Sequence, residues 1–181
     1  MNNRLTQKIL FLKIRNQDPE AYSQFYDLYV SRIYRFVFFK VNSVQDAQDL
    51  TSETFLKFWQ YIREGRLIKN PNAFIYMVAR NAVVDFYRSR TRENCSLESP
   101  EANHLLDEKA DLLKQQIADS EIKDLLSGLN NLKDEYKEII VLRFLDELSI
   151  SEIAAVLKKP KGAARVLLHR ALKALKESIN G

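Results

Sequence analysis

Three carboxylates lie close together in the segment DAQDLTSETFLKFW: Asp46, Asp49 and Glu53. Their spacing of three and four residues puts them on one face of a helix. Such a face can hold a metal ion for phosphoryl-transfer chemistry, or it can bind a basic surface of a partner protein. Acids near a helix start also stabilise the helix dipole without any further role. No histidine, second carboxylate run or glycine-rich phosphate loop in the sequence supports the metal site.

A second group of polar and aromatic residues occurs in the segment ARNAVVDFYRSRTR. Cations that follow a phosphate backbone, beside aromatic rings that stack on bases, are typical of proteins that bind single-stranded DNA. Phe86 is expected in the core, and Tyr87 can be in the core or on the surface. The polar residues interleaved with them are Arg80, Asn81, Arg88, Arg90 and Arg92. Taken alone, Asn81 would be interpreted as a residue that bonds the backbone or caps a local turn.

The segment SISEIAAVLKKPKGAARVLLHRALKAL contains two helix patterns joined by a short turn. Ser149 and Glu152 have the S-x-x-E spacing of a capping box, which begins a helix. Pro160 cannot continue that helix, but it suits the first turn of a new one. Two short helices with a tight turn are the arrangement in which a helix-turn-helix binds DNA.

The second helix of this pair is positively charged on its open side. The residues from Lys158 to Lys176 include seven Lys or Arg and no Asp or Glu. A solvated basic face usually mixes both signs of charge, so we interpret this one as a DNA-binding face. Its expected contacts are Lys159, Lys161, Arg165, His169, Arg170 and Lys173. The expected inner stripe is Ala164, Leu168, Ala171, Leu172 and Leu175.

Every strong apolar pattern in the chain is helical, so the predicted fold class is all-α. Apolar stripes predict helices over Pro19–Val41, Asp46–Ile62 and Asn70–Arg92. The first stripe, typical of a core, comprises Tyr22, Phe25, Tyr26, Tyr29, Ile33, Tyr34, Phe36 and Val37. A further helix before the helix-turn-helix has an inner stripe of Leu132, Tyr136, Ile139, Ile140 and Phe144.

The 181 residues are enough for one compact domain or two small ones. The stretch from Glu93 to Asp124 holds nine acids and three bases, and Pro100 interrupts it. Such a polar, acidic stretch has too little apolar surface to fold by itself. We therefore expect an N-terminal helical domain over residues 1–92, a flexible acidic linker over 93–118, and a C-terminal helix-turn-helix domain over 119–181.

Composition also restricts where the protein works. The single cysteine, Cys95, excludes an internal disulfide and suits a reducing cytosol. The first residues lack the apolar core and cleavage site of a signal peptide, and the run FVFFKV is far too short to span a membrane. We expect a cytoplasmic protein that is not inserted in a membrane.

Three segments, in this order and spacing, resemble conserved parts of the extracytoplasmic-function (ECF) sigma factors, the bacterial subunits that guide core RNA polymerase to promoters. The segments are DAQDLTSETFLKFW, NPNAFIYMVARNAVVDFYRSR and LKDEYKEIIVLRFLDELSISEIAAVLKKPKGAARVLLHRAL. The resemblance covers nearly everything from Ala21 to Leu175 except the linker. It implies core RNA polymerase, promoter DNA and an anti-sigma factor as partners.

The resemblance also implies roles for single residues. Core polymerase is bound by the helix that contains Asp46, Asp49, Glu53 and Trp59. The unpaired strand of the downstream promoter element is captured by the segment that contains Arg80, Asn81, Tyr87 and Arg88. The helix from Lys161 to Lys173 enters the major groove of the upstream element. The chain departs from the family in Glu147 and Lys158, where glycines are usual, and in Ala163 and Leu167, where a threonine and a cation are usual.

These observations predict a sigma factor with no catalytic activity, cofactor, metal or small-molecule substrate. One alternative is a helix-turn-helix transcription regulator that binds DNA but does not bind polymerase as a sigma subunit. An alternative from another class is a metal-dependent nucleic-acid enzyme that uses Asp46, Asp49 and Glu53.

Overall fold

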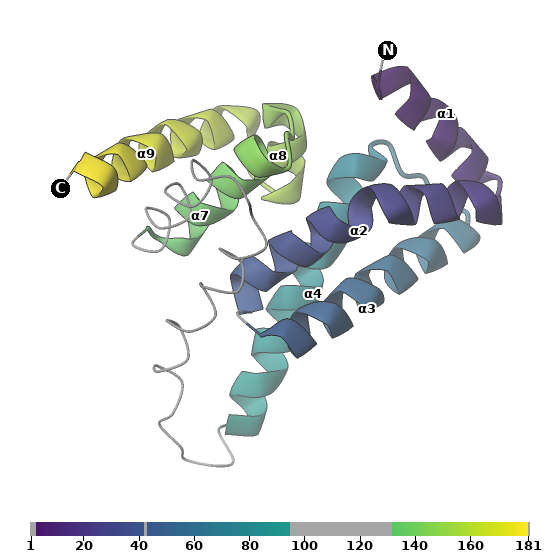
Figure 1. Ribbon diagram of the computed structural model, residues 1–181, viewed down its shortest axis with the longest axis horizontal. Helices are drawn as coiled ribbons and strands as arrows, with labels where there is room; N and C mark the ends of the chain where they lie inside the picture. Colours follow the sequence, from purple (N-terminus) through teal and green to yellow (C-terminus); the bar gives the residue numbers. More distant parts are fainter. Residues whose placement is uncertain (1–2, 42, 95–131, 181) are drawn as a thin grey trace. The chain divides into compact units, whose positions relative to one another are not determined.

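The computed structural model describes residues 3–41, 43–94 and 132–180, and these residues form helices and no strand (Figure 1). The predicted all-α class is therefore confirmed for the described residues. Contacts between Cα atoms divide the chain into two compact units, Met1–Arg90 and Thr91–Gly181. Most of the predicted linker, and the first residues of the predicted C-terminal domain, lie outside the described residues.

The N-terminal unit contains four helices: α1 (Asn3–Arg15), α2 (Pro19–Val41), α3 (Val44–Arg63) and α4 (Pro71–Asn94). Three of them begin at side-chain caps. Asp18, Ser43 and Asn70 each accept a hydrogen bond from the backbone N–H three residues later, which satisfies a donor that the helix leaves free. Because Ser43 is the cap, α3 begins two residues before the expected Asp46.

Aromatic residues form much of the core of this unit. Helix α2 packs along α3 and against α1. Phe25 of α2 stacks on Phe58 of α3 with ring centroids 4.7 Å apart, and Phe36 meets the edge of Tyr76 of α4 at 5.5 Å. The predicted stripe of α2 is thus largely core. Tyr26 is the exception, because it is 39% exposed, although its ring packs against Phe55 with centroids 4.6 Å apart.

The C-terminal unit contains α7 (Asp134–Ile140), the π-helical turn η1 (Val141–Leu145), α8 (Ile150–Val156) and α9 (Lys161–Asn180). Helix α9 packs against both α7 and α8. The largest fully buried side chains of this unit are Ile139, Ile140, Leu142, Leu148 and Ile153.

The π-helical turn η1 makes one predicted core position wrong. The inward position predicted for Phe144 is wrong, because its side chain is 51% exposed. The backbone N–H of Asp146 bonds the carbonyl of Val141, five residues earlier, at 3.0 Å. This wider turn rotates the following residues away from the α-helical register on which the prediction depended.

The capping box at the start of α8 is confirmed. The Ser149 N–H donates to the Glu152 carboxylate at 2.8 Å, and the Glu152 N–H donates to the Ser149 hydroxyl at 3.3 Å. The turns on both sides of α8 contain residues in the left-handed region, Glu147 with φ of 56° and Lys158 with φ of 53°. These are the two positions at which the family usually has glycine, and glycine adopts this conformation without steric cost.

Candidate nucleic-acid and protein interfaces

Helix α9 divides into a buried side and an open side. Its inner residues are Ala164, Leu167, Ala171 and Leu175, at the three- and four-residue spacing of a helix that packs on one face. The inward position predicted for Leu172 is wrong, since it is exposed, and Leu167 belongs to the core instead. The buried stripe therefore lies beside the predicted one, and it includes a position where the family usually has a cation.

All six DNA contacts predicted around α9, five Lys or Arg and His169, are exposed. Two of them have distant acidic neighbours: Lys159 lies 4.0 Å from Glu135, and Lys173 lies 3.9 Å from Glu177. Ion pairs of this kind on a surface contribute little energy, so both ammonium groups can exchange these neighbours for phosphates. Exposed cations thus lie along the open side of α9, where a DNA duplex can contact them.

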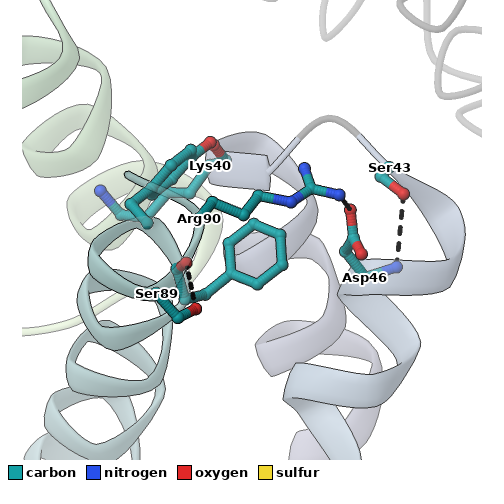
Figure 2. A network of polar contacts seen from close by, with 7 residues as sticks. Lys40, Ser43, Asp46, Ser89 and Arg90 are labelled. Atoms are coloured by element: carbon teal, nitrogen blue, oxygen red, sulfur yellow. Dashed lines mark hydrogen bonds and ion pairs between the residues drawn. The ribbon is translucent and has the colours of Figure 1, made fainter. Parts of the chain in front are cut away.

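The predicted acidic cluster is divided in the structure, and Figure 2 shows the contact of Asp46 with Arg90. The Asp46 carboxylate lies 3.6 Å from the guanidinium of Arg90 and is only 21% exposed. Arg90 also stacks on the Phe86 ring at 4.7 Å. Asp46 therefore faces α4 and connects the start of α3 to the last turns of α4.

A second contact reinforces this junction. The Tyr87 hydroxyl of α4 donates to the backbone carbonyl of Lys40, near the end of α2, at 2.5 Å. Together with the Asp46–Arg90 pair, it holds α4 on both sides of the connection between α2 and α3. The sequence analysis named Arg90 only as one of the cations of this segment and did not predict its pair with Asp46.

The other two carboxylates remain on the outer side of α3. Asp49 is exposed, and Glu53 is paired with Lys57 one turn later at 2.5 Å. Leu56 lies on the same side and is 57% exposed, which breaks the inward stripe of Leu50, Phe55, Phe58 and Ile62. This break was the signal that could have identified Leu56 as part of an interface. Within the described residues, no three His, Cys, Asp or Glu side chains are grouped to hold a metal ion.

Trp59 is half-buried at the edge of this acidic side of α3. Its ring packs on Tyr22 with centroids 4.5 Å apart, and the Tyr22 hydroxyl donates to the Phe55 carbonyl at 2.8 Å. Burial, and then the neighbouring Tyr26, raises the pKa of Tyr22 to about 12. The hydroxyl therefore stays protonated at neutral pH, remains a donor, and keeps the Trp59 ring in place.

The four predicted contacts of α4 lie along one side of that helix. Arg80 and Tyr87 are seven residues apart, as are Asn81 and Arg88, and seven residues make nearly two helical turns. Arg80 and Asn81 are half-buried and take part in interactions within the chain. Tyr87 and Arg88 are exposed, and Arg88 lies 3.6 Å from Asp85. Asn81 is in the helix interior, so it does not cap a turn.

None of the described helices combines the length and the apolar character that are needed to cross a membrane.

Family comparisons match both units. The Sigma-70 region 2 model matches residues 25–93, and the Sigma-70 region 4 model matches residues 122–175. The ECF RNA polymerase sigma factor BldN of Streptomyces coelicolor is 32% identical over 164 residues, which are 87% of this chain and 60% of BldN. The ECF RNA polymerase sigma factor SigW of Bacillus subtilis is 25% identical over 178 residues, which are 92% of this chain and 93% of SigW.

Solved structures show the same fold. The sigma factor RpoE, in complex with the anti-sigma factor NepR from Bartonella quintana, matches with a TM-score of 0.65 and 21% identity, over 87% of this chain and 96% of that one. CnrH, in complex with the cytosolic domain of CnrY, matches with a TM-score of 0.66 and 19% identity, over 95% of this chain and 96% of that one. From its two matched regions and its curated relatives, this chain belongs to the family of ECF sigma factors of RNA polymerase.

Proposed function

We propose that this chain binds core RNA polymerase and directs it to specific promoters, and that it catalyses no reaction itself. The observation that supports this most directly is the open side of α9, the second helix of the helix-turn-helix, which carries exposed cations and no acid from Lys161 to Lys176. No cofactor or small-molecule substrate is needed for this function. The chain would act in the bacterial cytoplasm, where polymerase meets DNA.

The outer side of α3 is the proposed polymerase-binding surface. Asp49 and Glu53 offer negative charge, while Leu56 and Trp59 offer apolar area close by. Charge complementarity directs encounter and fixes the register of a complex, and partly buried apolar groups supply affinity. Asp46 contributes to this surface indirectly, because its pair with Arg90 positions α3 against α4.

The side of α4 with Arg80, Asn81, Tyr87 and Arg88 is the proposed binding surface for the unpaired strand of the downstream promoter element. An amide both donates and accepts hydrogen bonds, so Asn81 can pair with the edge of a base that has left its stack. The exposed Tyr87 ring can stack on a base, while Arg88 lies near the phosphates.

The cations around α9 are the proposed binding surface for the upstream element. Side chains in the first turns, such as Lys161 and Arg165, are placed to contact base edges, whereas those further along meet phosphates. The division into residues 1–92, 93–118 and 119–181 would then separate two DNA-binding modules by a linker. We also infer an anti-sigma factor as a partner, which is supported by the solved complexes of RpoE with NepR and of CnrH with CnrY.

Reconstitution tests this proposal. The purified chain is mixed with core RNA polymerase, and binding and promoter-specific transcription are measured. The double change Asp49→Lys and Glu53→Lys should weaken polymerase binding without loss of helix content, because it reverses charge on an exposed surface. Asp27→Lys reverses one charge on an exposed part of α2, so it is the matched control for Asp49→Lys alone and should bind normally.

The outcomes separate the alternatives. A chain that binds DNA but never binds core polymerase is the helix-turn-helix regulator and contradicts the proposal. Cleavage of DNA that requires a divalent cation, and that Asp49→Asn abolishes, would favour the nucleic-acid enzyme.

A further inference from the structure

The centre of the open side of α9 is not cationic in its first two turns. At about 100° per residue, Gly162 and Val166 lie almost opposite the buried stripe of this helix. Arg165 lies to one side of them and Arg170 to the other. The part of the helix that projects furthest from the core therefore contains a glycine, Gly162, and a small apolar residue, Val166. They lie between the guanidinium groups of two arginines.

Nothing in the fold requires glycine at position 162. Gly162 lies in the helix with no positive φ, and a Cβ atom built on it meets no other atom within 4 Å. Glycine inside a helix is less stable than alanine, because it loses more backbone freedom on folding. The missing side chain thus costs stability without helping packing. It is useful only to a molecule that approaches this helix closely from outside.

Val166 also has no role in the core of its unit. Its side chain is 51% exposed, although the helix already has a complete buried stripe on its other side. An aliphatic group cannot form a hydrogen bond with a base edge or a phosphate. In the major groove of DNA, the apolar group available to it is the 5-methyl group of thymine.

We propose that Val166 contacts the 5-methyl group of one thymine in the upstream element, and that Gly162 allows the helix backbone to approach close enough for this contact. This inference rests on the proposed function of α9. Arg165 and Arg170 hold the helix in the groove from both sides, by bonds to phosphates or to base acceptors. Val166 thereby determines specificity for thymine at one base pair.

The test uses the full chain reconstituted with core RNA polymerase, and a duplex library in which the upstream region is randomised. The duplex that the complex selects is then synthesised with each thymine in turn replaced by deoxyuridine, which keeps the base pair and loses the methyl group. One replacement should weaken binding of the wild-type complex about fourfold, the effect of one buried methyl group. With Val166→Ala, the same replacement should have no measurable effect.

Two further variants complete the experiment. Leu12→Ala removes an equally exposed aliphatic side chain from α1 and should keep the wild-type response to deoxyuridine. Gly162→Ala should raise the midpoint of thermal unfolding of the C-terminal unit and weaken binding to the selected duplex. Opposite effects on stability and binding are not expected from a residue with a purely structural role.

Each outcome decides the matter. If no replacement distinguishes the wild type from Val166→Ala, or if Gly162→Ala binds as tightly as the wild type, the inference is wrong although the chain binds promoter DNA. If the complex selects no sequence, the proposed function fails and this inference fails with it.

Discussion

Replacing Lys158 by glycine should stabilise the C-terminal unit, although it removes a side chain. Lys158 ends α8 in the left-handed region, with φ of 53°. Its backbone N–H bonds the Ala155 carbonyl at 3.2 Å, and the N–H of Lys159 bonds the Ala154 carbonyl at 3.0 Å. These two bonds define a Schellman motif, in which glycine is the usual residue at this position.

The expected difference in stability between Lys158→Gly and Lys158→Ala follows from two opposing effects. A side chain in the left-handed conformation costs about 1–2 kcal/mol. Glycine, in turn, loses about 0.5–1 kcal/mol more than alanine through backbone entropy. Lys158→Gly should therefore be more stable than Lys158→Ala by about 1 kcal/mol. The comparison with alanine isolates the backbone, because both variants lack the lysine side chain and its interactions.

Gly65 provides a matched control in the other unit. It ends α3 with φ of 68°, and the N–H groups of Gly65 and Arg66 bond the carbonyls of Ile62 and Tyr61 in the same pattern. A Cβ atom at Gly65 would meet nothing within 4 Å, so Gly65→Ala changes only the backbone preference. We expect it to destabilise the N-terminal unit by about the same 1 kcal/mol.

The assay must follow the two units separately, because a chain with two compact units need not unfold in one step. Trp59 is the only tryptophan, and its fluorescence reports the N-terminal unit. Hydrogen exchange of the amides in α8 and α9 reports the C-terminal unit. For a domain of this size, 1 kcal/mol corresponds to about 4–8 °C in the unfolding midpoint. If Lys158→Ala is as stable as Lys158→Gly, or more stable, the turn at residue 158 is not strained and the reasoning is refuted.

Two further predictions concern the N-terminal unit. The pKa of Tyr22 is raised from its ordinary 10.0 to about 12, so its stabilising contribution is complete below pH 10 and is lost as the pH rises through 12. Tyr22→Phe should therefore make the free energy of unfolding fall less steeply between pH 10 and pH 12 in urea titrations, and an unchanged slope would argue against the buried hydroxyl. Asp46→Asn should lower the free energy of unfolding by about 0.2–1 kcal/mol, less at high salt, because it breaks the pair with Arg90. Asp49→Asn should leave the free energy of unfolding unchanged. Equal losses of stability in the two variants would contradict the division of the acidic cluster.

Much of the site could be predicted because the relevant interactions are local. The capping box of Ser149 and Glu152 spans three residues, and its two hydrogen bonds form as the spacing indicates. The charge of α9 was equally visible, since the excess of cations does not depend on which residues pack beneath them. The departures from usual glycines at Glu147 and Lys158 were also visible in the sequence, although their left-handed backbone came only from the structure.

The residues whose burial was wrongly predicted from the sequence depend on contacts or backbone geometry beyond the local pattern. Phe144 turned outward because a π turn changes the helical register, and no side-chain spacing signals such a turn. Leu167 rather than Leu172 is buried, because the angle at which α9 meets α7 and α8 selects between neighbouring apolar stripes.

The sequence by itself determined the helical class of this protein, the capping box at the start of α8 and the cationic character of α9, because each of these depends on residues within one or two turns of one another. Only the tertiary structure decided which of the three spaced carboxylates face outward. Asp46 has the same helical spacing as Asp49 and Glu53, but folding brings Arg90 of a later helix to it and turns it inward. A charge is available to a partner only where the fold leaves it exposed, and that depends on packing between helices distant in the sequence.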